Sequence, residues 1–71
     1  MVRTIPTKPS SNIAKVEYDD GSGDLIITFW KGSGKYLQVP VQTAEGFETA
    51  PSPGQYLNTY IKDLFVWERI S

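Results

Sequence analysis

The stretch Asp24-Leu25-Ile26-Ile27-Thr28-Phe29-Trp30 decides the fold, because it is the most strand-like segment of the chain. Branched and aromatic side chains make up most of it, and such residues favour β-strands. Turn-forming segments stand on both sides, Asp19-Asp20-Gly21-Ser22-Gly23 before it and Lys31-Gly32-Ser33-Gly34 after it. Clusters of Gly, Asp and Ser reverse the chain between strands. The stretch is therefore predicted to be the central strand of two consecutive hairpins.

The partners of this central strand lie just outside the two turns. Residues 13–18 form the first strand, in which Ala14, Val16 and Tyr18 are expected to share one face. Residues 35–39 form the third strand, after the second turn. Because two successive hairpins place three strands side by side, the middle of the chain is predicted to be a three-stranded antiparallel β-meander.

The segment before the meander has the composition of a flexible terminus. Residues 1–11 carry two prolines and several hydroxyl side chains, a mixture typical of flexible or extended ends. They are expected to form a flexible N-terminal arm. Residues 12–71 are then a single domain, because 71 residues are about half the usual domain length and leave no room for a second core.

Two short helices are predicted after the meander. Pro40 suits the start of a weak helix over residues 41–50, in which Gly46 costs about 1 kcal/mol relative to Ala. A second helix starts at Ser52, which can cap it, and continues as an apolar stripe. Residues 65–70 alternate in a strand-like way and are a candidate final strand. The predicted class is α+β, in the order βββαα with this candidate last β.

The composition excludes several kinds of chemistry. The chain has no Cys and no His, which rules out disulfides, thiolate nucleophiles, zinc ribbons and Ser–His triads. Its formal net charge of −1 is a cancellation, because residues 1–15 carry three cations and no acid, whereas residues 16–24 carry four acids and no cation. We therefore expect a binding module and not an enzyme, with no cofactor and no metal.

Three patterns that resemble chemical sites have simpler structural explanations. The acidic turn at residues 19–24 could begin a Ca²⁺ site, but its spacing lacks the alternation of EF-hand ligands. Lys31-Gly32-Ser33-Gly34-Lys35 lacks the Gly and Ser/Thr positions of a Walker loop. Glu45 and Glu48 could form a carboxylate pair, and a solvated helix face accounts for them equally well. None of the three is assigned to a catalytic or metal site.

Short motifs spread over residues 10–69 together resemble those of one known domain family. They are Ser11-Asn12-Ile13, Tyr18-Asp19, Leu25 with Ile27 and Phe29, Lys31-Gly32-Ser33, Tyr36-Leu37-Gln38-Val39-Pro40, Ala50-Pro51-Ser52-Pro53-Gly54-Gln55-Tyr56-Leu57-Asn58, Tyr60-Ile61-Lys62 and Glu68-Arg69. This pattern is similar to that of the KTSC domain, found as small stand-alone bacterial and phage proteins and at the C-terminus of some lysyl-tRNA synthetases. The family's central Tyr-x-Tyr appears here as Gly34-Lys35-Tyr36, so only the second aromatic is kept. The resemblance implies one small domain and, since the family has no established activity and only a suggested link to RNA, it implies little about function.

Aromatic and basic residues support two alternative functions. The first is an adaptor or regulator that binds a larger protein, and the resemblance points to the transcription or translation machinery as its setting. The alternative is RNA binding through a sheet face on which Lys15, Thr28, Trp30 and Tyr36 align if the hairpin register pairs them. A net charge of −1 disfavours a polyanion, so a protein partner is preferred. The candidate interaction residues are Lys15, Trp30, Lys31, Lys35, Tyr36 and Trp67.

Location and assembly are predicted from general features of the chain. It has no apolar run long enough to span a membrane and no signal-peptide pattern, so a cytoplasmic location without membrane contact is expected. A core this small can be completed by another copy of the chain. We therefore expect a monomer or a weak homo-oligomer.

Overall fold

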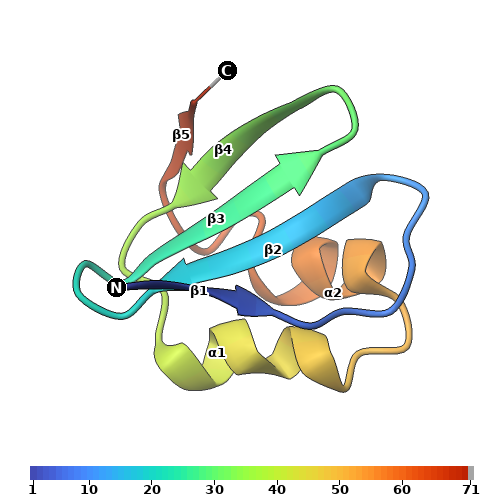
Figure 1. The fold of residues 1–71 in the computed structure, drawn as a ribbon, viewed down its shortest axis with the longest axis horizontal. Helices are drawn as coiled ribbons and strands as arrows, with labels where there is room; N and C mark the ends of the chain where they lie inside the picture. The colour runs from blue at the N-terminus through green and yellow to red at the C-terminus, as the bar shows by residue number, and fades with distance from the viewer. Residues whose placement is uncertain (71) are drawn as a thin grey trace.

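The computed structural model describes residues 1–70 as a five-stranded antiparallel sheet with short helices on one face (Figure 1). The strands lie side by side in sequence order, and each neighbouring pair is antiparallel. The elements are β1 (Val2–Ile5), β2 (Ile13–Asp19), β3 (Asp24–Phe29), β4 (Gly32–Tyr36), α1 (Val41–Glu45), the 3₁₀ turn η1 (Gly46–Glu48), α2 (Pro53–Tyr60) and β5 (Trp67–Arg69). The predicted α+β class is confirmed, but the sheet has five strands where the predicted meander has three.

Strands β2, β3 and β4 form the predicted meander, with β3 at its centre. The second hairpin differs from the prediction, because its turn is residues 30–31 and β4 begins at Gly32 instead of residue 35. Part of the glycine-rich segment therefore lies inside the sheet. A side chain on Gly34 would overlap the Trp67 ring, which explains why glycine stands there.

A bulge in β2 changes which of its side chains reach the core. The register shifts between Ile13 and Lys15, so Ala14 is the extra residue. Ala14 is exposed, whereas Ile13 and Val16 are buried. The expectation that Ala14 shares a face with Val16 is wrong, because the bulge interrupts the two-residue alternation of the strand.

The expected N-terminal arm contains a strand. All four residues of β1 pair with β2, and Ile5 is only 1% exposed. Arg3 connects the strand to its surroundings through ion pairs with Asp20 at 3.2 Å and Glu45 at 3.1 Å. The prediction of a flexible arm is therefore wrong for residues 2–5. A strand this short carries almost no periodic signal, and the buried Ile5 is recognised only once the core is formed.

Both helices start where the sequence predicts, but the first is shorter than predicted. The Ser52 hydroxyl accepts a hydrogen bond from the backbone N–H of Gln55 at 3.3 Å, which caps α2. Helix α1 ends at Glu45 and passes into η1 instead of continuing to residue 50. In the part of the chain that the structure describes, no helix is long and apolar enough to cross a membrane.

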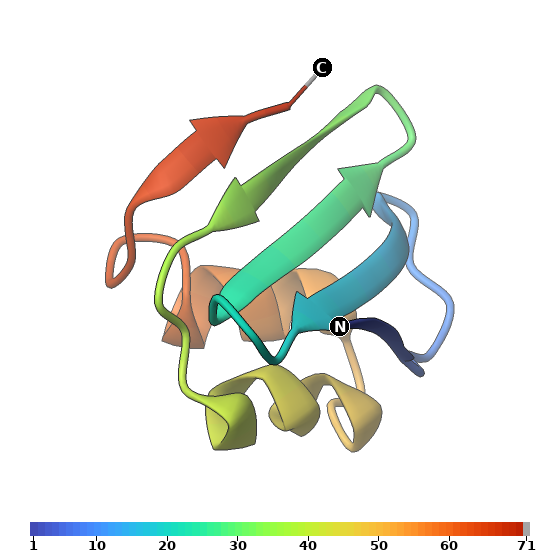
Figure 2. The same ribbon diagram turned by 60° about the vertical axis from the view of Figure 1, so that its left-hand side comes forward.

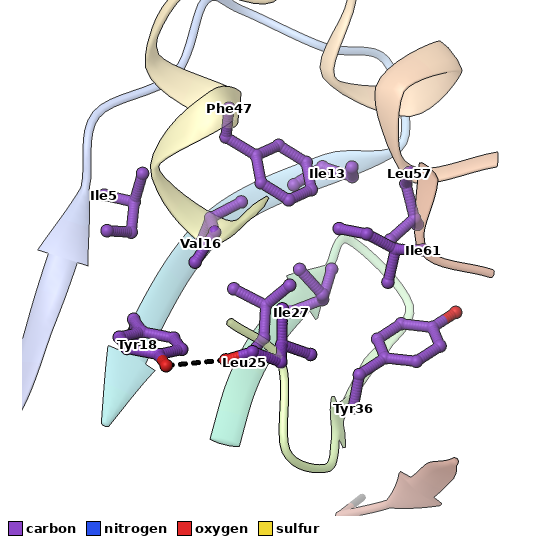
Figure 3. Close-up of a cluster of buried hydrophobic side chains, with 12 residues drawn as sticks. Ile5, Ile13, Val16, Tyr18, Leu25, Ile27, Tyr36, Phe47, Leu57 and Ile61 are labelled. Carbon is purple, nitrogen blue, oxygen red and sulfur yellow. Dashed lines mark hydrogen bonds between the residues drawn. The ribbon is translucent and has the colours of Figure 1, made fainter. Parts of the chain in front are cut away.

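The core lies between the sheet and the helices. Both helices cover the same face of the sheet, and no helix of the described chain covers the opposite face, which we call the open face (Figure 2). The buried apolar side chains are Ile5, Ile13, Val16, Tyr18, Leu25, Ile27, Tyr36, Val39, Ala44, Phe47, Leu57 and Ile61. The Tyr18 hydroxyl donates a hydrogen bond of 2.6 Å to the Val39 carbonyl oxygen, drawn as a dashed line in Figure 3. This bond satisfies a polar atom that would otherwise be buried without a partner.

The role of β1 in the core is tested by replacing Ile5→Ala. Because Ile5 is fully buried, the variant is expected to lose about 2–4 kcal/mol in free energy of unfolding, measured by urea denaturation. Thr4→Ala is the control, since Thr4 is exposed on the same strand and its loss should stay within about 0.5 kcal/mol. Equal unfolding midpoints for the two variants would show that β1 does not stabilise the domain.

The contact between Gly46 and α2 gives a second test. A β-carbon on Gly46 would overlap the Tyr56 hydroxyl, which donates a hydrogen bond of 2.7 Å to the Thr43 carbonyl oxygen. Gly46→Ala is therefore expected to lower the free energy of unfolding by about 1–3 kcal/mol, although helix propensity alone favours Ala by about 1 kcal/mol.

The matched control is Gly54→Ala in the first turn of α2. Among the described residues, the atom nearest to its new β-carbon would be the Ser10 hydroxyl oxygen at 4.0 Å, so stability should stay unchanged or rise by up to about 1 kcal/mol. Thermal and urea unfolding of both variants provide the measurement. A stabilised Gly46→Ala variant would contradict the packing of Tyr56 described above.

Candidate functional site

The six predicted interaction residues do not form one surface, because the sheet register separates them. The structure distributes them over the open face of the sheet (Lys15, Lys35), the core (Tyr36) and the neighbourhood of the β3–β4 turn (Trp30, Lys31, Trp67). Each of the three places has its own electrostatic and packing character.

The open face carries paired charges and, at the strand positions that the structure describes, no aromatic ring. Lys15 Nζ lies 3.6 Å from Glu17 Oε1. Lys35 Nζ lies 3.2 Å from Asp24 Oδ2 and 3.8 Å from Glu68 Oε1. Each carboxylate offsets the positive potential of the lysine beside it. This face therefore lacks the basic and aromatic character of the sheet surfaces with which proteins bind RNA.

Tyr36 belongs to the core and not to the open face. It lies opposite Leu25 in the β3–β4 ladder and is only 6% exposed. The expectation that it shares a face with Lys15 and Trp30 is wrong, because the turn has two residues instead of four and the register changes with it. Burial raises the pKa of the Tyr36 hydroxyl, and the charge of Asp63 adds to this effect. The ring is a neutral packing element.

Trp30 is an exposed aromatic residue that is held by hydrogen bonds. It is 68% exposed. Its indole Nε1–H donates to the Ser10 carbonyl oxygen at 3.3 Å, and its backbone N–H donates to the Asn12 carbonyl oxygen at 3.2 Å. The Ser10 hydroxyl in turn accepts hydrogen bonds of 3.2 Å from the backbone N–H groups of Asn12 and Ile13. The ring is thus presented to solvent in a defined position, so a partner that packs on it loses less entropy in ordering it.

A cleft of about 320 Å³ opens beside Trp30. Its walls come from three parts of the chain, namely the start of β2 with the residues before it, the end of β3 with the β3–β4 turn, and helix α2. The lining residues are Ser11, Asn12, Ile13, Phe29, Trp30, Lys31, Gly54, Leu57 and Asn58. The Ile, Leu and Phe side chains are buried or half-buried, whereas the two asparagines and the lysine are exposed. The cleft therefore has an apolar floor and a polar rim.

A second hollow of about 260 Å³ adjoins the cleft, because both are lined by Phe29 and Lys31. Its remaining lining residues are Gly32, Ser33, Trp67 and Arg69. Trp67 is 40% exposed, and its ring centroid lies 6.0 Å from that of Phe29 and 4.7 Å from that of Tyr36. We call the area formed by the cleft and the hollow the Trp30 surface. Among the described residues that line it, none carries a carboxylate.

The position of Trp67 explains the departure from the Tyr-x-Tyr motif. Strand β5 places Trp67 beside Tyr36, and a β-carbon on Gly34 would overlap the Trp67 ring and approach the Glu68 carbonyl oxygen. A larger side chain at position 34 is therefore incompatible with Trp67 in this position. Trp67 provides an aromatic ring on the same face as Tyr36, where the motif has two tyrosines.

The acidic turn between β2 and β3 is neutralised by cations of the same chain. The N-terminal ammonium lies 3.2 Å from Asp19 Oδ1, and the Gly21 backbone N–H donates to the same oxygen at 2.9 Å. The hydrogen bond from Gly21, followed by that from the N-terminus, lowers the pKa of Asp19. Asp20 and Asp24 each lie 3.2 Å from a basic side chain. Within the described residues, no group of three or more His, Cys, Asp or Glu is placed to hold a metal ion.

Sequence reasoning missed three polar members of the Trp30 surface, Asn12, Asn58 and Arg69. A signal for them was present, because each lies in a stretch on which the family resemblance rests. What the sequence does not indicate is that these stretches meet. They do so because α2 packs beneath the end of β3 and β5 pairs with β4.

Comparisons with known proteins agree with this architecture. A family model described as the KTSC domain matches residues 9–65. A lysine–tRNA ligase of Nostoc punctiforme is 36% identical over 66 residues, which are 90% of this chain and 12% of the ligase. The lysine–tRNA ligase of a second Nostoc strain is 35% identical over the same length. The chain thus spans only a small part of these ligases.

A solved structure extends the agreement to three dimensions. The crystal structure of a KTSC domain protein from Yersinia pestis matches the present structure over the full length of both chains, with a TM-score of 0.88 and 29% sequence identity. The architecture described above is therefore shared by this KTSC domain protein, and the family model covers most of the sequence. The chain belongs to the KTSC domain family.

Proposed function

We propose that this chain is a non-enzymatic module that binds a larger protein through the Trp30 surface, acting as an adaptor or regulator. The observation that carries the proposal is Trp30 itself, which is 68% exposed and yet fixed by hydrogen bonds to Ser10 and Asn12. A large exposed ring costs solvation free energy in the free protein. Its retention in a defined position is typical of an anchor for a partner, since Trp is enriched among the residues that dominate interface energies.

The surroundings of Trp30 support the same proposal. Trp67 adds a second partly exposed ring near the same turn, and Phe29 lies between the two hollows. Interfaces combine such apolar centres with a polar rim, and Asn12 and Asn58 lie at the rim here. The absence of His and Cys from the sequence removes the commonest catalytic nucleophile–base and zinc arrangements. Binding without chemistry is therefore the function that we propose.

The relatives suggest where the partner belongs. The matching proteins are described as lysine–tRNA ligases, and this chain corresponds to 12% of their length. A module that this chain shares with these ligases can act on the same process as they do, which is an argument from analogy. We therefore propose a partner in the translation machinery, which would place the chain in the cytoplasm.

The proposal predicts that Trp30→Ala weakens partner binding without unfolding the domain. The tagged chain is used to isolate a partner from nuclease-treated lysate, and the purified partner is then titrated calorimetrically with each variant. Truncation of a Trp anchor should reduce the affinity at least about tenfold. The thermal midpoint should change little, because the residue is mostly exposed. Trp67→Ala is less suitable, since Trp67 also packs against Tyr36.

Lys15→Ala is the matched control for this experiment. Lys15 lies on the open face and is not among the residues that line the Trp30 surface, so its replacement should leave the affinity within about twofold of that of the unmodified chain. If Trp30→Ala and Lys15→Ala bind the partner equally well, the Trp30 surface is not the interface. A partner that is lost on nuclease treatment would also count against a direct protein contact.

RNA binding is the second candidate function, and one observation favours it. The Trp30 surface combines two tryptophans with Lys31 and Arg69, and none of its described lining residues is acidic. Aromatic rings stack on bases and cations contact phosphates. Two observations count against this alternative. The net charge is −1, and the open face carries two lysines but four carboxylates, those of Glu17, Asp19, Asp24 and Glu68.

A salt-dependent titration separates the two functions. Labelled single-stranded RNA is titrated with the protein at about 50 and 200 mM salt, because phosphate contacts weaken steeply as salt rises. We expect no change in the electrophoretic mobility of the RNA up to protein concentrations on the order of tens of micromolar. These concentrations are well above the dissociation constants of specific protein–nucleic acid complexes. A complex that weakens with salt and disappears in Lys31→Glu would instead establish RNA binding.

A further inference from the structure

We propose that the Trp30 surface recognises a short acidic segment of its partner that also carries an apolar side chain. This inference rests on the proposed function and specifies the chemistry of the partner. The apolar side chain would enter the cleft beside Trp30, and the carboxylate would lie near Lys31, which lines both the cleft and the hollow.

The first argument is the distribution of charge. Most basic groups of the sheet are matched by carboxylates of the same chain, because Arg3, Lys15, Lys35 and the N-terminal ammonium all form ion pairs. Lys31 is exposed and, among the residues that the structure describes, has no carboxylate within ion-pair distance. Its positive charge is therefore available to a ligand, in contrast to the charges of the open face.

The second argument is the composition of the lining. Lys31 and Arg69 are the ionisable side chains among the described lining residues of the two hollows, and no carboxylate is found there. The chain as a whole carries more acids than bases. A surface of one sign in a protein of the opposite net sign favours ligands of complementary charge, which here are anionic.

The third argument is the shape of the cleft. Its floor is formed by Ile13, Phe29 and Leu57, which are buried or half-buried, and Asn12 and Asn58 are exposed at its rim. An apolar side chain of a partner would cover the floor and remove it from water. The exposed asparagine amides can pair with the backbone of an extended segment. The cleft therefore offers a peptide apolar and hydrogen-bonding contacts in addition to the charge of Lys31.

A protein segment fits these observations better than a nucleic acid does. Polyanion binding gains its affinity from several phosphate contacts made at once, whereas here Lys31 is the one lysine among the described lining residues. The nearby open face presents the carboxylates of Glu17 and Glu68, which would repel an extended phosphate backbone. A single acidic residue beside an apolar anchor matches the exposed charge of Lys31 on this surface.

Synthetic peptides test the inference directly. Three fluorescein-labelled peptides of equal length share the same Leu and Phe positions and differ in the intervening residues, which are Asp and Glu, Asn and Gln, or Lys. Binding to the full chain is measured by fluorescence anisotropy at low and high salt. The acidic peptide is expected to bind at least about tenfold more tightly than the amide peptide at low salt, with the difference reduced at high salt.

Two charge-reversal variants locate the binding. Lys31→Glu should reduce the affinity for the acidic peptide at least about tenfold. Lys15→Glu makes the same change in net charge on the open face and should have an effect of less than about twofold. Circular dichroism and thermal unfolding establish that both variants remain folded. Equal losses in the two variants would mean that only overall charge matters, which would overturn the inference.

The remaining outcomes separate this inference from the proposed function. If the amide or basic peptide binds as well as the acidic one and Trp30→Ala removes the binding, the inferred preference for an acidic segment is wrong. The proposal that the Trp30 surface binds a protein then stands. If no peptide binds but Trp30→Ala still weakens binding of the purified partner, the inferred recognition of an acidic segment is again wrong and the proposed function stands. If single-stranded RNA binds through Lys31 and no peptide does, both proposals fail.

Discussion

The register between β3 and β4 is the constraint on which the rest of the structure depends. Leu25 and Ile27 are completely buried, so β3 can turn only one of its faces toward the helices. The two-residue turn at residues 30–31 then directs Tyr36 into the core opposite Leu25. It also leaves Trp30 beyond the last pair of the β3–β4 ladder, where its side chain is mostly exposed. A shift of one residue would exchange the faces of β4 and remove this arrangement.

The small size of the domain explains why residues 2–5 and 67–69 are built into the sheet as its edge strands. A domain of this length buries only roughly 60% of its unfolded surface, so few apolar groups can be left out of the core. Strand β1 contributes Ile5 at one edge, and β5 contributes Trp67 at the other. Gly34 and Gly46 stand where any larger side chain would overlap an aromatic ring of β5 or α2. The candidate binding surface is thus partly made of the same residues that complete the fold.

The electrostatic organisation of the molecule connects fold to function. The acidic turn between β2 and β3 is balanced by the N-terminus, Arg3 and Lys35, whereas the opposite end of β3 carries Lys31 without such a partner in the described chain. The net charge of −1 therefore says little about the potential at the Trp30 surface. The proposed binding of an acidic partner segment depends on this local positive charge and not on the net charge of the chain.

The sequence by itself determined the α+β class, the central strand and the Ser52 cap, and it indicated Trp30 as a candidate interaction residue. These depend on composition, periodicity and local hydrogen bonds. Only the tertiary structure decided that residues 2–5 form an edge strand, that Tyr36 is buried and that Asn12 and Asn58 meet at one cleft. These features arise from pairing and packing between segments far apart in the chain. Local pattern carries no information about such contacts, since register and helix docking are set by the whole core at once.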